Sequence, residues 1–168
     1  MNSEEHAPNT KPRQLSASAR YLAFSLRTEQ FAIPLLEVKE VIGVTEATAV
    51  PQMPPYFKGI INLRGQIISV IDLRVRLQLP KGTDGPETSI IILDLGSVSI
   101  GVIVDSINSV LAIAPEELSN APDGTGLKDQ YVKGVARKDN KLTLILDIAA
   151  VLSINDLNSI KQSQKRAA

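Results

Sequence analysis

The sequence contains no cysteine and no tryptophan, and its only histidine is His6. The absence of cysteine excludes disulfides, thiolate metal sites and cysteine nucleophiles. Because His6 lies in a polar segment that we expect to be disordered, the fold also has no histidine to serve as a general base, a phosphorylation site or a metal ligand. We therefore expect no metal site and no cofactor.

An excess of either charge is also lacking, since 18 lysines and arginines balance 18 aspartates and glutamates. A balanced chain argues against nucleic acid or an anionic membrane as the partner, because phosphate binding needs a basic face, although a local basic patch stays open. No apolar run approaches the roughly 20 residues that span a bilayer, and residues 1–20 contain no signal peptide. We expect a cytoplasmic protein that is not inserted in a membrane.

Catalytic motifs are missing as well: there is no Walker-type phosphate loop and no GxGxxG, GxSxG or HExxH. Asp72 and Asp147 could be read as a pair of catalytic carboxylates, but each is better explained as the N-cap of a short helix. A carboxylate-only glycosidase would also need an aromatic sugar platform, and aromatic residues make up only 4% of the chain. We therefore expect no enzyme activity.

What the chain does contain is β-branched sequence divided by turns. The residues from Tyr56 to Leu77 predict a strand, a turn at Arg64-Gly65, a second strand, and a helix capped by Asp72. Further strands are predicted at Tyr21–Leu26, Phe31–Ile33, Val44–Val50, Thr88–Leu95, Val98–Val104, Tyr131–Arg137 and Lys141–Leu146. Helical spacing of apolar residues predicts a short helix or turn at 34–42, and the same spacing resumes around 107–111.

An internal repeat organises these elements. A shift of 69 residues places Leu22 on Ile91 and Val38 on Ile107, and a shift of 75 places Gly59 on Gly134. The pattern indicates two small β-rich barrels packed together, at about 20–80 and 88–154, with exchange of terminal elements between them allowed. We expect a disordered tail at 1–19, one domain over 20–154 that includes a polar loop at 114–130, and a polar tail at 155–168.

The repeat separates architectural residues from candidate functional ones. Gly59 and Asp72 recur as Gly134 and Asp147, so a backbone or capping role explains them. Arg64 does not recur: the matched turn is Asp139-Asn140, which suits a type I′ turn better than arginine does. From the turn alone, Arg64 is either a solvated cation or a functional one. For Glu40, which matches Ser109, a solvated face is the simpler reading.

The run FKGIINLRGQIISVIDLR, with FAIPLLEVKEVI before it and IIILDLGSVSIGVIVDSINSVL after it, resembles the CheW-like domain family over about residues 20–153. The resemblance implies an all-β fold with short helices, made of two packed SH3-like five-stranded barrels. It also implies a non-enzymatic adaptor that couples chemoreceptors to the CheA histidine kinase in chemotaxis. The partners would be the helical receptor tip, which docks between the barrels, and the kinase regulatory domain, with self-association in rings at membrane receptor arrays.

Site residues follow from the same resemblance. Positions implicated in receptor docking match Val38, Glu40, Gly59 and Arg64, and positions implicated in kinase contact match Ile90, Ile107 and Val110. Ser69 departs from the family pattern, which usually has proline there. Two alternatives stay open: an adaptor of a pilus-linked chemosensory system, and, from another class, a small-barrel nucleic-acid binder.

Overall fold

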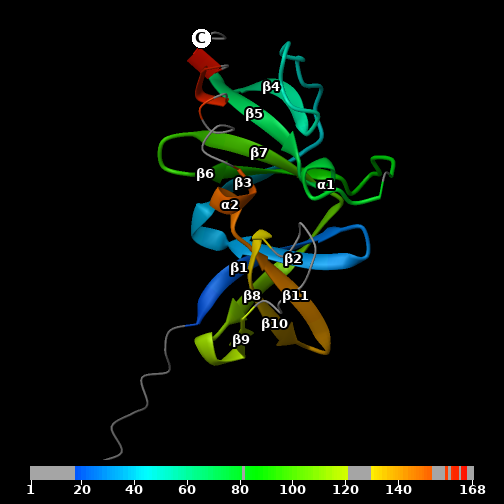
Figure 1. The fold of residues 1–168 in the computed structure, drawn as a ribbon, viewed down its shortest axis with the longest axis vertical. Coiled ribbons are helices and arrows are strands. Elements are labelled where there is room, and N and C mark those ends of the chain that lie inside the picture. The colour runs from blue at the N-terminus through cyan, green and yellow to red at the C-terminus, as the bar shows by residue number, and fades with distance from the viewer. Residues whose placement is uncertain are drawn as a thin grey trace, which may run out of the picture.

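The computed structural model describes residues 18–80, 82–120, 130–152, 158, 160–162 and 164–165. Two curved sheets are stacked along the long axis of the molecule, and the short helices α1 (Leu73–Arg76) and α2 (Ile148–Val151) lie between them (Figure 1). The part of the loop at 121–129, most of the tail at 1–19 and much of the tail at 155–168 lie outside the described residues.

Each sheet forms one barrel. Sheet A, which we call barrel A, has the order β8-β1-β2-β11-β10-β9, and sheet B, or barrel B, has the order β3-β6-β7-β5-β4. The strands of barrel A are β1 (Ala19–Leu26), β2 (Glu29–Pro34), β8 (Ser106–Ile113), β9 (Leu118–Ser119), β10 (Val132–Lys138) and β11 (Lys141–Leu146). Those of barrel B are β3 (Val38–Gly43), β4 (Phe57–Leu63), β5 (Gln66–Asp72), β6 (Ser89–Asp94) and β7 (Ser99–Val104). The all-β prediction is confirmed, and barrel A has a sixth strand because the two-residue β9 pairs with β10.

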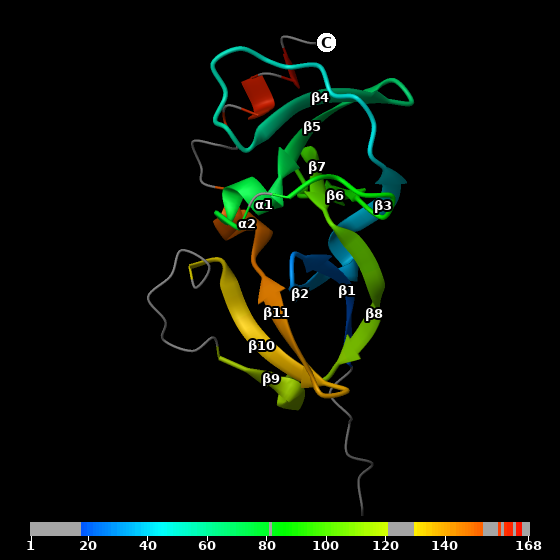
Figure 2. The ribbon, with the colours of Figure 1, turned by 90° about the vertical axis from the view of Figure 1, so that its right-hand side faces the viewer.

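The sheets mix the two sequence repeats. The first hairpin, β1–β2, pairs with β8 and β11 of the second repeat, while the hairpin β6–β7 pairs with β3 and β5 of the first. The boundaries 20–80 and 88–154 therefore divide the repeats and not the sheets. The chain crosses from barrel A to barrel B between β2 and β3, and it returns between β7 and β8 (Figure 2).

Both barrels are closed in the same way. After β3 the chain crosses the open side of barrel B, where Thr48 forms a bridge with Ile60 of β4. After β8 the 3-10 turn Pro115–Glu117 leads into β9, where Ser119 pairs with Val135, the repeat counterpart of Ile60. The strand predicted at Val44–Val50 is therefore wrong, since only this single bridge forms there.

The largest apolar cluster fills the space between the barrels. In β1, Leu22, Phe24 and Leu26 belong to this cluster, whereas Tyr21 and Ala23 belong to the smaller interior of barrel A. Hairpin β6–β7 has the same division, with Ile90 and Ile92 in the interior of barrel B. Because both faces of the central hairpins are buried, their sequences read as continuous apolar runs.

The helix or turn predicted at 34–42 is present only as the 3-10 turn Leu35–Glu37, after which β3 begins. The helical spacing around 107–111 is misleading, because this segment belongs to β8. Each strand contains a bulge at the same repeat position: Lys39 is the extra residue opposite β6, and Asn108 is the extra residue opposite β1. A bulge adds one residue to the period-two pattern, so the apolar positions acquire a spacing that resembles that of a helix.

The C-terminal residues depart from the polar tail that we expected. Residues 158, 160–162 and 164–165 are helical, and Ile160 is 1% exposed within the main core. In both views these residues lie close to β4 and β5 of barrel B (Figures 1 and 2). Within the described part of the chain, no helix has the length and apolarity to cross a membrane.

Candidate partner-binding site

The structure brings Arg64 and Glu40 together. Arg64 lies at the β4–β5 turn with φ of 51°, followed by Gly65 with φ of 85°, and the side chain of Asn62 accepts a hydrogen bond from the Gly65 amide (2.9 Å). From this turn the Arg64 guanidinium pairs with the carboxylate of Glu40 on β3. These strands are opposite edges of sheet B, so the pair forms because the barrel closes.

The exposure of this pair argues against a purely stabilising role. The Arg64 side chain is 72% exposed and that of Glu40 is 31% exposed. An exposed ion pair contributes about 0.2–1 kcal/mol. A non-glycine residue in the left-handed region costs about 1–2 kcal/mol, and asparagine or glycine would fit the turn better. The pair therefore roughly offsets the strain of its own turn and leaves a cation accessible at the surface.

The other two predicted receptor residues are placed differently. Val38, at the start of β3, is half-buried against the core between the barrels. Gly59 is buried with φ of 140°, and a Cβ there would lie 2.3 Å from the backbone oxygen of Thr48. Gly59 is therefore required by the bridge that closes barrel B, and no side chain at this position could face a partner.

Three polar residues lie beside the pair: Gln66 and Ser99 were not selected from the sequence, and Lys39, like Glu40, was most simply read as part of a solvated face. Lys39, the bulge residue of β3, donates to the Ser99 hydroxyl (2.8 Å), and the Gln66 amide lies 3.4 Å from the same oxygen. Lys39 and Gln66 extend the surface around Glu40 and Arg64, whereas Ser99 is buried beneath them. In the repeat Lys39 matches the uncharged Asn108, but a charge present in one copy is most often only solvated, so the sequence did not mark Lys39 as part of a site.

The three predicted kinase-contact residues do not share a surface. Ile90 is 1% exposed inside barrel B, because the hairpin β6–β7 belongs to that barrel. Ile107 and Val110 lie on β8 of barrel A, where Ile107 packs against the main core and Val110 is 50% exposed. Of the three, Val110 offers the most surface to a partner.

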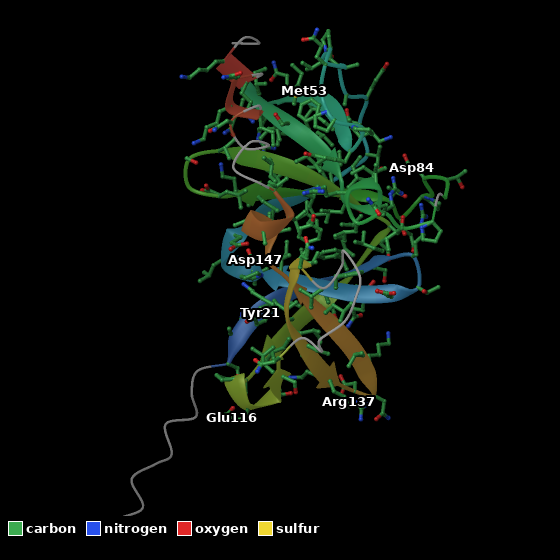
Figure 3. The ribbon with its side chains drawn as sticks, viewed as in Figure 1. Tyr21, Met53, Asp84, Glu116, Arg137 and Asp147 are labelled. Carbon is green, nitrogen blue, oxygen red and sulfur yellow. The ribbon has the colours of Figure 1, made fainter. Side chains whose placement is uncertain are left out.

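A buried ionic cluster joins the two barrels near α1, and the sequence reasoning missed it. Arg74 is 5% exposed and bonds to Asp72 (2.9 Å), Asp84 (2.8 Å) and Asp105 (2.9 Å). Asp105 also accepts from the backbone amide of Arg27 in the β1–β2 turn (2.6 Å). Figure 3 shows Asp84 beside α1. Arg74 matches Ala149 in the second repeat. Like Arg64, it is a charged residue that occurs in only one copy of the repeat, so the same comparison could have marked it as a candidate.

In this cluster the pKa of Arg74 is raised and the pKa of Asp105 is lowered. The hydrogen bond with Asp72 raises the pKa of Arg74, burial opposes that rise, and the bonds with Asp84 and Asp105 add to it. Burial alone would raise the pKa of Asp105, but the Arg27 amide and the Arg74 guanidinium outweigh it and lower that pKa below its usual 3.8. The charged state is therefore favoured on both sides. Among the described residues, no group of three or more acidic or histidine side chains is arranged to hold a metal ion.

Arg76 makes a second link between the repeats. Its guanidinium lies 5.0 Å from the ring centroid of Tyr56 and 5.1 Å from that of Tyr131, which are repeat counterparts. Its Nε donates to the backbone oxygen of Val151 (2.8 Å). Such cation–π contacts hold α1 and α2 in place between the barrels.

Residues 20–155 match the family model of the CheW-like domain. The chain belongs to the CheW-like domain family. The match spans both barrels and contains the Glu40–Arg64 pair, the bulged strands β3 and β8, and the Arg74 cluster. It supports the resemblance seen in the sequence.

Known CheW proteins are similar to this chain over most of its length. The chemotaxis protein CheW of Bacillus subtilis (strain 168) is 34% identical over 140 residues, which is 83% of this chain and 90% of the relative. The chemotaxis protein CheW of Treponema pallidum (strain Nichols) is 30% identical over 165 residues, with coverage of 92% and 97%. The crystal structure of the scaffolding protein TtCheW from Thermoanaerobacter tengcongensis superposes with a TM-score of 0.77 at 31% identity, covering 83% of this chain and 95% of that one. These relatives support the chemotaxis adaptor function expected from the sequence.

Proposed function

We propose that this CheW-family chain is a non-enzymatic cytoplasmic adaptor that couples chemoreceptors to a CheA-type histidine kinase. The observation that carries the proposal is the Glu40–Arg64 pair, an accessible charge pair held in place by a strained turn and a closed barrel. Family membership and similarity to a scaffolding protein support the adaptor role.

The receptor would dock beside β3. The half-buried Val38 offers apolar surface next to the pair, and Leu36, in the 3-10 turn before β3, is fully exposed. A receptor helix can bury these apolar groups, while the charges of Glu40 and Arg64 set its register through charge-assisted hydrogen bonds.

The kinase regulatory domain would contact the outer face of β8. This strand is an edge of sheet A, and its exposed Val110 provides apolar surface for a second barrel. Adaptors and kinases that meet in this way would assemble in rings at membrane receptor arrays.

The decisive experiment replaces Arg64 with asparagine. Arg64→Asn removes the cation and suits the left-handed turn, so we expect the melting temperature to stay the same or rise. Affinity for the purified cytoplasmic tip of a chemoreceptor from the same genome should fall about tenfold or more, measured by isothermal titration calorimetry.

The matched control is Arg137→Asn, an exposed arginine on β10 whose repeat counterpart is Asn62. It changes the same charge on barrel A, and receptor affinity should not change. If Arg64→Asn and the reversal Glu40→Arg both bind the receptor tip like the wild type, the receptor assignment is wrong.

A further inference from the structure

A hollow of about 590 Å³ opens on barrel A beside the parallel strands β2 and β11. Leu144 and the 56% exposed Leu142 supply its apolar lining. Its polar wall includes Gln30 and Asn108, whose side chains share a hydrogen bond of 2.8 Å. Apart from Asn108 on β8, the hollow is lined by residues outside the strands proposed for the receptor and the kinase.

The lining residues have repeat counterparts in barrel B, at the shifts found in the sequence. The pairs are Thr28 with Ser97, Gln30 with Ser99, Asn108 with Lys39, Lys141 with Gln66, Leu142 with Ile67 and Leu144 with Ser69. The backbones correspond as well, since β5 and β7 are parallel neighbours like β11 and β2.

In barrel B the corresponding place is covered by the C-terminal helical residues of the chain itself. The Gln164 amide donates to the backbone oxygen of Ser99 (3.0 Å) and to the hydroxyl of Ser69 (3.3 Å). One turn earlier Ile160 is buried in the main core, and Ser97 lies beside the same segment. This part of barrel B therefore supports a short helix.

The matched residues are more buried in barrel B than in barrel A, as expected if only the place in barrel B is covered by a helix. Ser69 is fully buried and Ile67 is half-buried, whereas their counterparts Leu144 and Leu142 are half-buried and 56% exposed. Barrel A thus has leucine in place of serine at one position and a more exposed aliphatic side chain at the other, and nothing described lies over them. Exposed apolar surface of this kind marks an interaction site.

We propose that the hollow binds an amphipathic helix of a partner protein, laid across β2 and β11 as the C-terminal residues are laid across β5 and β7. The helix would place apolar side chains over Leu142 and Leu144, where Gln164 meets Ser69 in barrel B, and a polar side chain at the edge toward Gln30, the counterpart of Ser99. A second copy of the chain cannot easily supply this helix, because its C-terminal residues already cover its own barrel B.

The partner we assign is the helical tip of a chemoreceptor, so the inference rests on the proposed function and adds a second contact to it. Glu29 and Lys141 both line the hollow, so a receptor helix with charges of both signs at its edges fits this rim better than a strongly acidic or basic one.

The absence of native cysteine allows a direct test. In Leu142→Cys the new thiol is the only one, and its alkylation rate can be followed by mass spectrometry with and without the receptor tip fragment. We expect the fragment to slow alkylation about tenfold or more, while a control Val75→Cys variant, at a 41% exposed position on α1 outside the hollow, is unaffected. The purified kinase regulatory domain should not protect Cys at position 142.

Affinity measurements complete the test. Leu142→Gln should weaken binding of the receptor fragment about tenfold, and Val75→Gln should not. Protection by the kinase domain alone, or concentration-dependent protection without any partner, would overturn the helix assignment. Wild-type binding that Arg64→Asn weakens but Leu142→Gln does not would overturn the hollow and leave the proposed function standing. No binding by the wild-type chain would overturn both.

Discussion

Two glycines at matched positions of the repeat have different physical roles. Gly59 has a positive φ and touches the backbone of Thr48, whereas a Cβ on Gly134 would meet the oxygen of Ser119 at 3.3 Å without a left-handed backbone. The position in barrel B is therefore strained for any other residue, and the position in barrel A is only tight.

We expect Gly59→Ala to destabilise the protein by at least about 2 kcal/mol, because the methyl group must displace the Thr48 bridge. Gly134→Ala should cost less than about 1 kcal/mol. Urea denaturation of both variants measures the difference. Equal losses would contradict the conclusion that the positive φ and the close approach to Thr48, and not the repeat position as such, require glycine.

The lowered pKa of Asp105 predicts how stability depends on pH. An unfolded carboxyl group binds protons more readily than this one does, so its contribution is present above the usual value of 3.8 and is lost as the pH falls toward the folded value. Asp105→Asn should reduce the slope of unfolding free energy against pH below about pH 4. It should also cost about 1–3 kcal/mol at neutral pH, because Arg74 loses a partner. Denaturation at pH 3 to 7 tests this, and an unchanged acid slope would count against it.

At the scale of elements, the sequence was sufficient for the hairpins but not for the bulged strands. The turns at Arg64-Gly65 and Asp139-Asn140 and the caps Asp72 and Asp147 are local signals, and the structure has all of them. Lys39 and Asn108 are bulges only because β3 and β8 pair with strands far away in the chain. From the sequence alone, the spacing of apolar residues that these bulges produce could therefore not be distinguished from the spacing in a helix.

The candidate site, too, could be predicted only in part from the sequence. The repeat marked Arg64 as a candidate and the family pattern pointed to both Arg64 and Glu40, but their contact depends on barrel closure. Ile90 and Gly59 were also selected, although burial shows that neither presents a side chain to a partner. A pattern in the sequence identifies positions that matter without distinguishing contact from packing.

The C-terminal helical residues make an element-scale prediction. Ile160→Ala should destabilise the protein by about 2–5 kcal/mol, since Ile160 is 1% exposed in the core between the barrels. The neighbouring Lys161→Ala should change stability by less than about 0.5 kcal/mol. Thermal unfolding of the two variants gives the comparison, and a negligible effect of Ile160→Ala would show that the segment does not dock.

At the scale of the molecule, the exchange of strands predicts that neither repeat folds alone. Fragments 1–80 and 88–168 would each lack strands that complete the sheets containing their own hairpins. We expect no cooperative thermal transition in either fragment by circular dichroism, and recovery of the β signal when the two are coexpressed. A transition in one isolated fragment would mean that its strands can pair within one repeat.

Arg76 makes the junction between the two repeats asymmetric. It lies almost equally far from Tyr56 and Tyr131, and it bonds to Val151, the residue that matches it in the other repeat. One guanidinium from the first repeat therefore contacts the matched tyrosines of both, while the second repeat contributes a backbone oxygen in place of a second cation. The two halves share one backbone pattern but cannot be exchanged for each other at this point.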